Sequence, residues 1–222
     1  MQYELILGNR VYSSWSLRAW LLLRCISIEF EHRVVPLYTD EFERFRQDCF
    51  PARQLPTLIV NESGNRRVIW DSFSIVEFLN ERHPNSGLWP SDPWMRAAAR
   101  SLCAEMHSGF AMLRECMPMN CRAMGRKVPL PDALTSDIDR IIAIWSECHR
   151  RFSGDSGWLF GHFTVADAMF APVVLRFRTY GINLPESAGF YPHRVLESEA
   201  VQEWLAAAEC ETEVIDAEEK GT

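Results

Sequence analysis

The sequence predicts an α/β domain followed by an all-α domain, and three observations support this. Strand-like and helix-like hydrophobic patterns alternate over residues 1–83. The stretch from His83 to Pro93 is rich in Pro, Gly, Ser and Asn and breaks both patterns. Beyond it, apolar residues recur only at the three- and four-residue spacing that is typical of amphipathic helices. We therefore expect domains over residues 1–83 and 93–222.

The first three elements are expected to form a β-α-β unit. Tyr3 to Leu7 and Phe30 to Leu37 are short segments whose composition favours strands. Between them, Ser14 to Cys25 places its apolar residues at helical spacing. The chain should therefore pass from strand to helix and back to strand within its first forty residues.

A polar helix, a hairpin and another helix are expected to complete this domain. The polar helix covers Asp40 to Asp48, and the strands Thr57 to Val60 and Arg67 to Trp70 are joined by the turn residues Asn61 to Asn65. The segment Ser72 to Arg82 returns to helical period, with Ser72 as its expected N-cap. The predicted order is β-α-β-α-β-β-α.

The rest of the chain shows no strand pattern. Helices are predicted over Trp94–Met117, Pro131–Phe152, Val165–Phe177 and Ser198–Ala208. The tail from Glu209 onward is acidic and is expected to fray. The second domain should therefore be all-α.

Composition and charge exclude several classes of function. A net charge of −7 disfavours a surface that binds nucleic acid, because such surfaces depend on clustered Lys and Arg. No apolar run approaches the length of a membrane-spanning helix, and the N-terminus lacks the pattern of a secretory signal. The odd set of seven cysteines contains no C-x-x-C pair, so we expect reduced thiols in a cytoplasmic protein and no metal site.

Four short motifs, in this order along the chain, carry a resemblance to a known family. The run Tyr12 to Arg18 resembles the active-site segment with two serines of bacterial, zeta-like glutathione transferases. Pro51 to Leu58 is similar to the family's segment around its cis-proline, and Asp71-Ser72 to its acidic residue and serine. Thr164 to Asp167 resembles the capping box of the family's helical domain. Together they resemble the glutathione S-transferase superfamily, with its serine-type, zeta-like members related to maleylacetoacetate isomerase.

This resemblance implies a fold, a co-substrate and an activity. The N-terminal domain would be thioredoxin-like and bind glutathione, the C-terminal domain would be a helical bundle, and two chains would form a homodimer. The implied activity is a transferase that activates the glutathione thiolate for attack on a small electrophile. Trp15 stands where zeta enzymes place a cysteine, which bears on their isomerase reaction but not on the fold. The alternatives are a zeta-like isomerase of an unsaturated diacid, or a non-enzymatic binding or regulatory protein of the same fold.

Ser13 and Ser14 are the candidate catalytic residues, because the thiolate is the nucleophile and must be favoured over the thiol. Lowering a thiol pKa by two units needs about 2.7 kcal/mol. One hydrogen bond to a charged group contributes about 1.5–3 kcal/mol and a helix terminus about 0.3–1 kcal/mol. By its match to the family's first serine, Ser13 ranks before Ser14, with the Tyr12 hydroxyl third. The alternative is that both serines only cap the helix.

The resemblance also assigns binding residues for glutathione. Leu55 and a cis-Pro56 would hold its peptide backbone, and Asp71 with Ser72 its γ-glutamyl end. Arg53 and Gln54 are the candidates for its glycyl carboxylate, with plain solvation as the alternative.

A second-substrate pocket is expected beside the glutathione site. Its candidate residues are Tyr12, His107, Arg176 and Arg178, and the two arginines favour anionic substrates. For His107, a structural role on its helix is the alternative interpretation.

Overall fold

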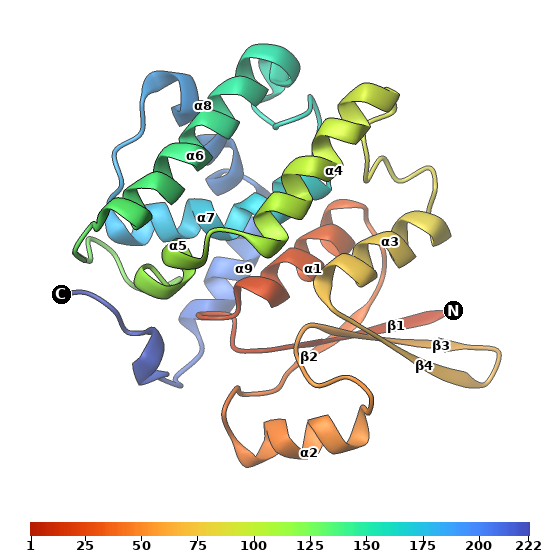
Figure 1. Cartoon of the computed structure of the whole chain (residues 1–222). Helices are drawn as coiled ribbons and strands as arrows, with labels where there is room; N and C mark the ends of the chain where they lie inside the picture. Colours follow the sequence, from red (N-terminus) through yellow and green to blue (C-terminus); the bar gives the residue numbers. More distant parts are fainter.

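A computed structural model describes all residues 1–222 and confirms the predicted fold class. A four-stranded sheet with three helices comes first, and a group of helices follows (Figure 1). The first part consists of β1 (Gln2–Leu7), α1 (Ser14–Cys25), β2 (Glu31–Val34), α2 (Asp40–Asp48), β3 (Thr57–Glu62), β4 (Asn65–Trp70) and α3 (Ser72–Arg82). The order β-α-β-α-β-β-α is the one predicted.

The sheet has the strand order β2-β1-β3-β4. β1 runs parallel to β2 and antiparallel to β3, and β3 and β4 form the predicted hairpin. Because side chains alternate along a strand, Leu5 and Leu58 join the main core, whereas Ile6 and Ile59 join a second, smaller one with Phe45 of α2. In Figure 1, α1 and α3 accordingly lie on one side of the sheet and α2 on the other.

The second part of the chain is helical. It consists of α4 (Pro93–Ser108), α5 (Ala111–Cys116), α6 (Asp132–Cys148), α7 (Val165–Tyr180), α8 (Glu186–Leu196) and α9 (Glu199–Glu209), with short helical turns at His149–Ser153, Gly154–Ser156 and Asp216–Glu218. α7 is buried along nearly its whole length and packs against α1 and α4. One continuous apolar core therefore joins the sheet to these helices.

The predicted capping box at the start of α7 is present. The Asp167 carboxylate accepts hydrogen bonds from the N–H groups of Thr164, at 2.7 Å, and Leu159, at 3.1 Å. Asp167 is fully buried, and this burial raises the pKa of its carboxyl group to about 7. The motif ties the loop before α7 to the helix that forms the centre of the core.

Two helix predictions need correction. The helix expected over Trp94–Met117 is divided into α4 and α5 at Gly109 and Phe110, where Phe110 has a φ of 58°. A side chain at Gly109 would lie 2.8 Å from the Glu105 carbonyl oxygen, so the break requires glycine. α8 was missed, because Pro192 within it is normally a helix breaker.

The acidic tail does not fray, contrary to the prediction. The carboxylate of Glu211 accepts hydrogen bonds from the N–H groups of Arg10, at 2.8 Å, and Val11, at 3.2 Å. Further along, Glu219 accepts from the Tyr12 hydroxyl at 2.6 Å and pairs with Arg126. The tail is therefore held against the loop between β1 and α1 by charges that the sequence showed only as an acidic run.

Candidate functional site

A cavity of 360 Å³ lies where the N-terminal ends of α1 and α3 meet the C-terminal end of α4. Its lining residues are Trp15, Gln54, Leu55, Pro56, Asp71, Ser72 and His107. All of them except Trp15 were candidates from the sequence. The cavity thus gathers residues from three separate motifs into one place.

Asp71 lies between the end of β4 and the start of α3. Its Oδ1 accepts a hydrogen bond from the Phe73 N–H at 2.8 Å, so Asp71, and not the predicted Ser72, is the N-cap of α3. The residue has a φ of 71°, which Asp tolerates better than most residues. Its Oδ2 lies 3.5 Å from Nε2 of His107. One carboxylate oxygen therefore holds the helix end while the other lies at the cavity.

Ser72 lines the cavity with a hydroxyl group that has no partner in the protein. The residue is only 1% exposed, and its Oγ makes no hydrogen bond. An unpaired buried hydroxyl costs free energy, about 1–3 kcal/mol. It lies at the first turn of α3, where N–H groups without helical acceptors favour an anion. This end of the cavity suits a carboxylate.

Leu55 and Pro56 form the adjacent wall. The peptide bond between them is cis, as the resemblance implied, and a second cis bond joins Phe50 to Pro51. Neither the main-chain N–H nor the C=O of Leu55 takes part in a hydrogen bond within the protein. The main chain of Leu55 can therefore pair with the backbone of an extended peptide.

Trp15 is the cavity residue that the sequence analysis did not select. The guanidinium carbon of Arg18 lies 4.2 Å from its ring centroid, and that of Arg114 lies 4.7 Å away. The ring of His107 contacts Trp15 edge-on, with centroids 5.2 Å apart. The indole thus separates the cavity from two cations, and the signal in the sequence was its place in the Tyr12 to Arg18 motif, directly after Ser14.

Ser13 and Ser14 lie at the start of α1 and make different hydrogen bonds. The Ser13 hydroxyl donates to Oγ of Ser16 at 2.8 Å and accepts from the Ser16 N–H at 3.3 Å, as an N-cap does. Oγ of Ser14 accepts from Nη2 of Arg176 at 3.1 Å. Both serines are buried, at 7% and 5% exposure, and neither lines the cavity, although the next residue, Trp15, does.

Three of the four residues predicted for a second-substrate pocket do not line this cavity. The Tyr12 hydroxyl is bonded to Glu219, and burial, followed by that hydrogen bond, raises the pKa of Tyr12. Arg176 is buried and donates to the Met117 carbonyl as well as to Ser14. Arg178 is only half-buried and lies outside the cavity lining. Only His107 of this set lies at the cavity.

Arg53 also lies outside the cavity. Its side chain is exposed to solvent, whereas the neighbouring Gln54 contributes to the lining. Gln54 is therefore the better placed of the two candidates for a ligand's carboxylate.

The region behind Trp15 is rich in positive charge. Arg18, Arg114 and Arg176 form no ion pair with a carboxylate. Burial, followed by the charges of Arg114 and Arg176, lowers the pKa of Arg18 well below its ordinary value. Burial, followed by the charge of Arg114, lowers the pKa of Arg176 to about 10. Nη1 of Arg18 has no hydrogen-bond partner. The N-terminus of α1 therefore lies in a positive electrostatic environment.

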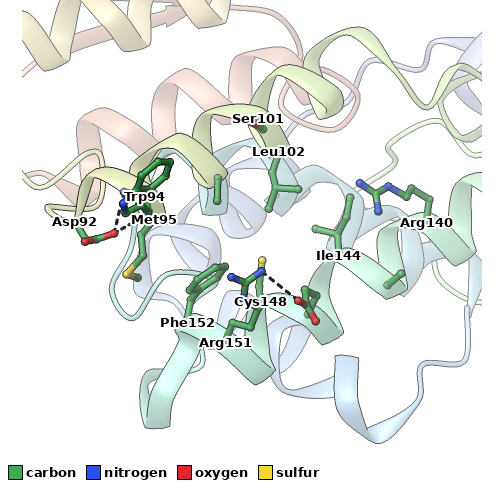
Figure 2. A pocket seen from close by; sticks show the side chains of 13 residues that line it. Asp92, Trp94, Met95, Ser101, Leu102, Arg140, Ile144, Cys148, Arg151 and Phe152 are labelled. Atoms are coloured by element: carbon green, nitrogen blue, oxygen red, sulfur yellow. Dashed lines mark hydrogen bonds and ion pairs between the residues drawn. The ribbon is translucent and has the colours of Figure 1, made fainter.

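A larger cavity of 530 Å³ lies between α4 and α6 and contains none of the candidate residues (Figure 2). Apolar side chains such as Leu102, Ile144 and Phe152 form much of its wall, and Arg151 is paired with Glu147 at 3.4 Å. Burial raises the pKa of its Cys148 thiol to about 12, so this thiol is a poor nucleophile. The smaller cavity, where unpaired polar groups converge, is the better candidate site.

Comparison with known proteins decides the family. Residues 12–82 match the glutathione S-transferase N-terminal domain, and residues 96–207 match the glutathione S-transferase C-terminal domain. The chain belongs to the glutathione S-transferase family. The resemblance inferred from the four motifs is thereby confirmed.

The relatives of this protein within the glutathione S-transferase family include maleylacetoacetate isomerases. The protein of Pseudomonas aeruginosa is 26% identical over 79% of this chain and 81% of its own length. A probable maleylacetoacetate isomerase of Caenorhabditis elegans is 34% identical, but over only 45% of this chain and 44% of its own length. A stringent starvation protein A homologue of Coxiella burnetii is 25% identical over 75% of each chain.

Solved structures show the same fold. A glutathione transferase homologue from Burkholderia with bound glutathione has a TM-score of 0.70 at 24% identity and covers 94% of this chain and 99% of its own. The maleylacetoacetate isomerase of Anaeromyxobacter dehalogenans, with dicarboxyethyl glutathione and citrate in its active site, has a TM-score of 0.63 at 25% identity and covers 91% and 90%.

None of the helices combines the length and the apolar character that crossing a bilayer requires. No three His, Cys, Asp or Glu side chains are grouped so that they could hold a metal ion.

Proposed function

We propose that this protein is a glutathione transferase that binds glutathione in the 360 Å³ cavity and activates its thiolate for attack on a small electrophile. The observation that carries the proposal is the convergence of polar groups there: the unpaired Ser72 hydroxyl, the unpaired main chain of Leu55, and Oδ2 of Asp71, which lies beside His107. These groups match the carboxylate, peptide and ammonium groups of one tripeptide.

Each part of glutathione has a partner in this arrangement. The γ-glutamyl carboxylate accepts from Oγ of Ser72 and the first N–H groups of α3, and the ammonium group pairs with Oδ2 of Asp71. The cysteinyl backbone pairs with the main chain of Leu55, and the side chain of Gln54 holds the glycyl carboxylate. The thiol then extends past Trp15 toward the start of α1, where a serine hydroxyl and the helix end favour the anion.

A zeta-like isomerase acting on an unsaturated diacid is the second candidate function. Maleylacetoacetate isomerases are among the relatives, and the buried arginines behind Trp15 favour an anionic substrate. Against this candidate, the indole of Trp15 fills the position where zeta enzymes place a cysteine. Assays of an electrophilic conjugation substrate and of a cis-unsaturated diacid, run side by side, decide between the two reactions.

The proposal includes the assembly and location of the protein. It keeps residues 1–83 as the glutathione-binding domain and 93–222 as the helical domain, in a cytoplasmic homodimer that uses no metal and binds neither nucleic acid nor membrane. The family assignment supports the dimer. Light scattering should give about twice the 25.7 kDa mass of one chain, and a mass of one chain across micromolar concentrations would exclude the dimer.

Calorimetric titration with glutathione tests the proposed function. Wild-type protein should bind one glutathione per chain, and Ser72→Ala should weaken binding about tenfold because a hydrogen bond to a carboxylate is lost. Ser101→Ala, on α4 in the lining of the other cavity, is the matched control and should bind as wild type does. If the wild type did not bind glutathione, the proposed transferase function would be rejected. A non-enzymatic role of the same fold would then remain, and a stringent starvation protein A homologue is among the relatives of this chain.

A further inference from the structure

The two serines at the start of α1 differ in what their hydroxyl protons can do. Ser13 donates its proton to Oγ of Ser16, which also accepts from the N–H of Gly8. Its oxygen accepts from the Ser16 N–H, so both functions of the Ser13 hydroxyl serve the helix end and the preceding loop. Releasing this proton toward a ligand would break a buried hydrogen bond.

Ser14 has the opposite arrangement. Its Oγ only accepts, from Nη2 of Arg176, and its proton has no acceptor within the protein. Arg176 is itself held in place, because its Nη1 donates to the Met117 carbonyl oxygen and the side chain is buried. The guanidinium therefore fixes the Ser14 oxygen, while the Ser14 proton keeps no acceptor within the protein.

A hydroxyl group that accepts from a cation is a stronger donor. Hydrogen bonds in a chain polarise one another, and the effect is largest where the local dielectric is low. Arg176, which donates to Ser14, lies within electrostatic range of Arg114 and Glu218. Arg18 lies within range of Arg114, Arg176 and Asp71, and Arg114 within range of Asp137. The Arg176 guanidinium, which donates to the Ser14 oxygen and forms no ion pair, favours an anion beside the Ser14 hydroxyl.

We infer that Ser14, oriented and polarised by Arg176, is the hydroxyl donor to the glutathione thiolate, and that Ser13 is a structural cap. The inference rests on the proposed function, because it names the residue that activates the thiol in that site. The thiol S–H proton leaves to water, and the Ser14 hydroxyl stays intact and donates to the sulfur anion. Ser14 is then the catalytic residue and Arg176 the positioning residue.

The test measures the pKa of the bound glutathione thiol from thiolate absorbance as the pH is raised. Ser14→Ala should raise this pKa by about one to two units, because a hydrogen bond to the charged form is lost. Ser14→Thr, which keeps a hydroxyl group, should restore the pKa to within about half a unit of the wild type. Ser13→Ala should lower the melting temperature but leave the thiol pKa unchanged.

Arg176 is tested by the same readout. Arg176→Met should raise the bound thiol pKa by about one unit, and Arg176→Lys, which keeps a cationic donor, should raise it less. If Arg176→Met does not fold, the difference between Arg176→Lys and wild type carries the test. A merely structural role of Arg176 would change the melting temperature and leave the thiol pKa where it was.

The outcomes separate this inference from the proposed function. A wild type that does not bind glutathione overturns both. Binding in which Ser13→Ala, and not Ser14→Ala, raises the thiol pKa overturns the inference alone. Binding in which Ser14→Ala and the Arg176 variants raise the thiol pKa, with Ser14→Thr restored, supports it.

Discussion

Replacing Asp71 by asparagine should weaken glutathione binding about tenfold and leave the stability of the fold unchanged. In the structure, Oδ1 of Asp71 caps α3 by accepting from Phe73 at 2.8 Å. Asparagine keeps an oxygen at that position, and the two residues are equivalent as N-caps. What asparagine lacks is the negative charge that the proposal places against the ammonium group of glutathione.

The size of the effect follows from the exposure of the carboxylate. A hydrogen bond between charged groups contributes about 1.5–3 kcal/mol. Because the Asp71 side chain is 31% exposed, solvent screening reduces this to the lower end of the range. A loss of about 1.4 kcal/mol is tenfold in Kd. Asp71→Ala should lose the same affinity and, in addition, about 1 kcal/mol of unfolding free energy with the cap.

Calorimetric titration with glutathione and with an analogue that lacks the α-ammonium group forms a double cycle with these variants. The analogue should bind the wild type about tenfold more weakly than glutathione does, and it should bind Asp71→Asn as well as it binds the wild type. Urea denaturation of each variant measures the cap separately. Equal sensitivity of the wild type and Asp71→Asn to removal of the ammonium group would refute the pairing.

Three further predictions concern other parts of the molecule. Asp167 has a pKa of about 7 in the fold, above that of the unfolded chain, so its contribution to stability is present at acid pH and is lost as the pH rises toward 7. Between pH 4 and 7, the unfolding free energy of the wild type should therefore fall relative to that of Asp167→Asn by up to about 1.4 kcal/mol per pH unit. Urea denaturation measures both, and an equal pH dependence of the two proteins would contradict this prediction. Deleting residues 212–222 removes the partner of Tyr12 and should cost about 1–3 kcal/mol of unfolding free energy, whereas no change would mean that the tail frays in solution. Gln54→Ala should weaken glutathione binding severalfold and Arg53→Ala should change it less than twofold, as titration would show, because only Gln54 lines the cavity.

The parts of the site that the sequence predicted are those made within short segments. Leu55-Pro56 and Asp71-Ser72 each lie at the start of one element, so local motifs were enough to select them. The N-cap of α3 was predicted at Ser72 but is Asp71. Both residue types commonly cap helices, and only the hydrogen bond from the Phe73 N–H to Asp71 distinguishes them. The fold class followed from hydrophobic period alone, as periods of two and of 3.6 residues are local properties.

The parts that were missed depend on partners far along the chain. Arg176 contacts Ser14 across 162 residues, and Tyr12 contacts Glu219 across 207, so neither pairing leaves a local pattern. Arg176 was predicted to line a second-substrate pocket, and in the structure its buried guanidinium donates to Ser14 and to the Met117 carbonyl. The wall that Trp15 forms depends on two guanidinium groups from different helices. Such contacts are determined by how the helices pack.

The pKa of the glutathione thiol bound to the wild-type protein shows whether this protein activates the thiol. If the chain holds glutathione with its sulfur at the start of α1, beside a serine hydroxyl and buried guanidinium groups, the bound thiol should ionise at least one pH unit below the value of about 8.5 for a free cysteine thiol. The thiolate absorbance of the complex, measured between pH 5 and 10 against free glutathione, gives this value. A bound thiol that ionises at the same pH as free glutathione would contradict the account.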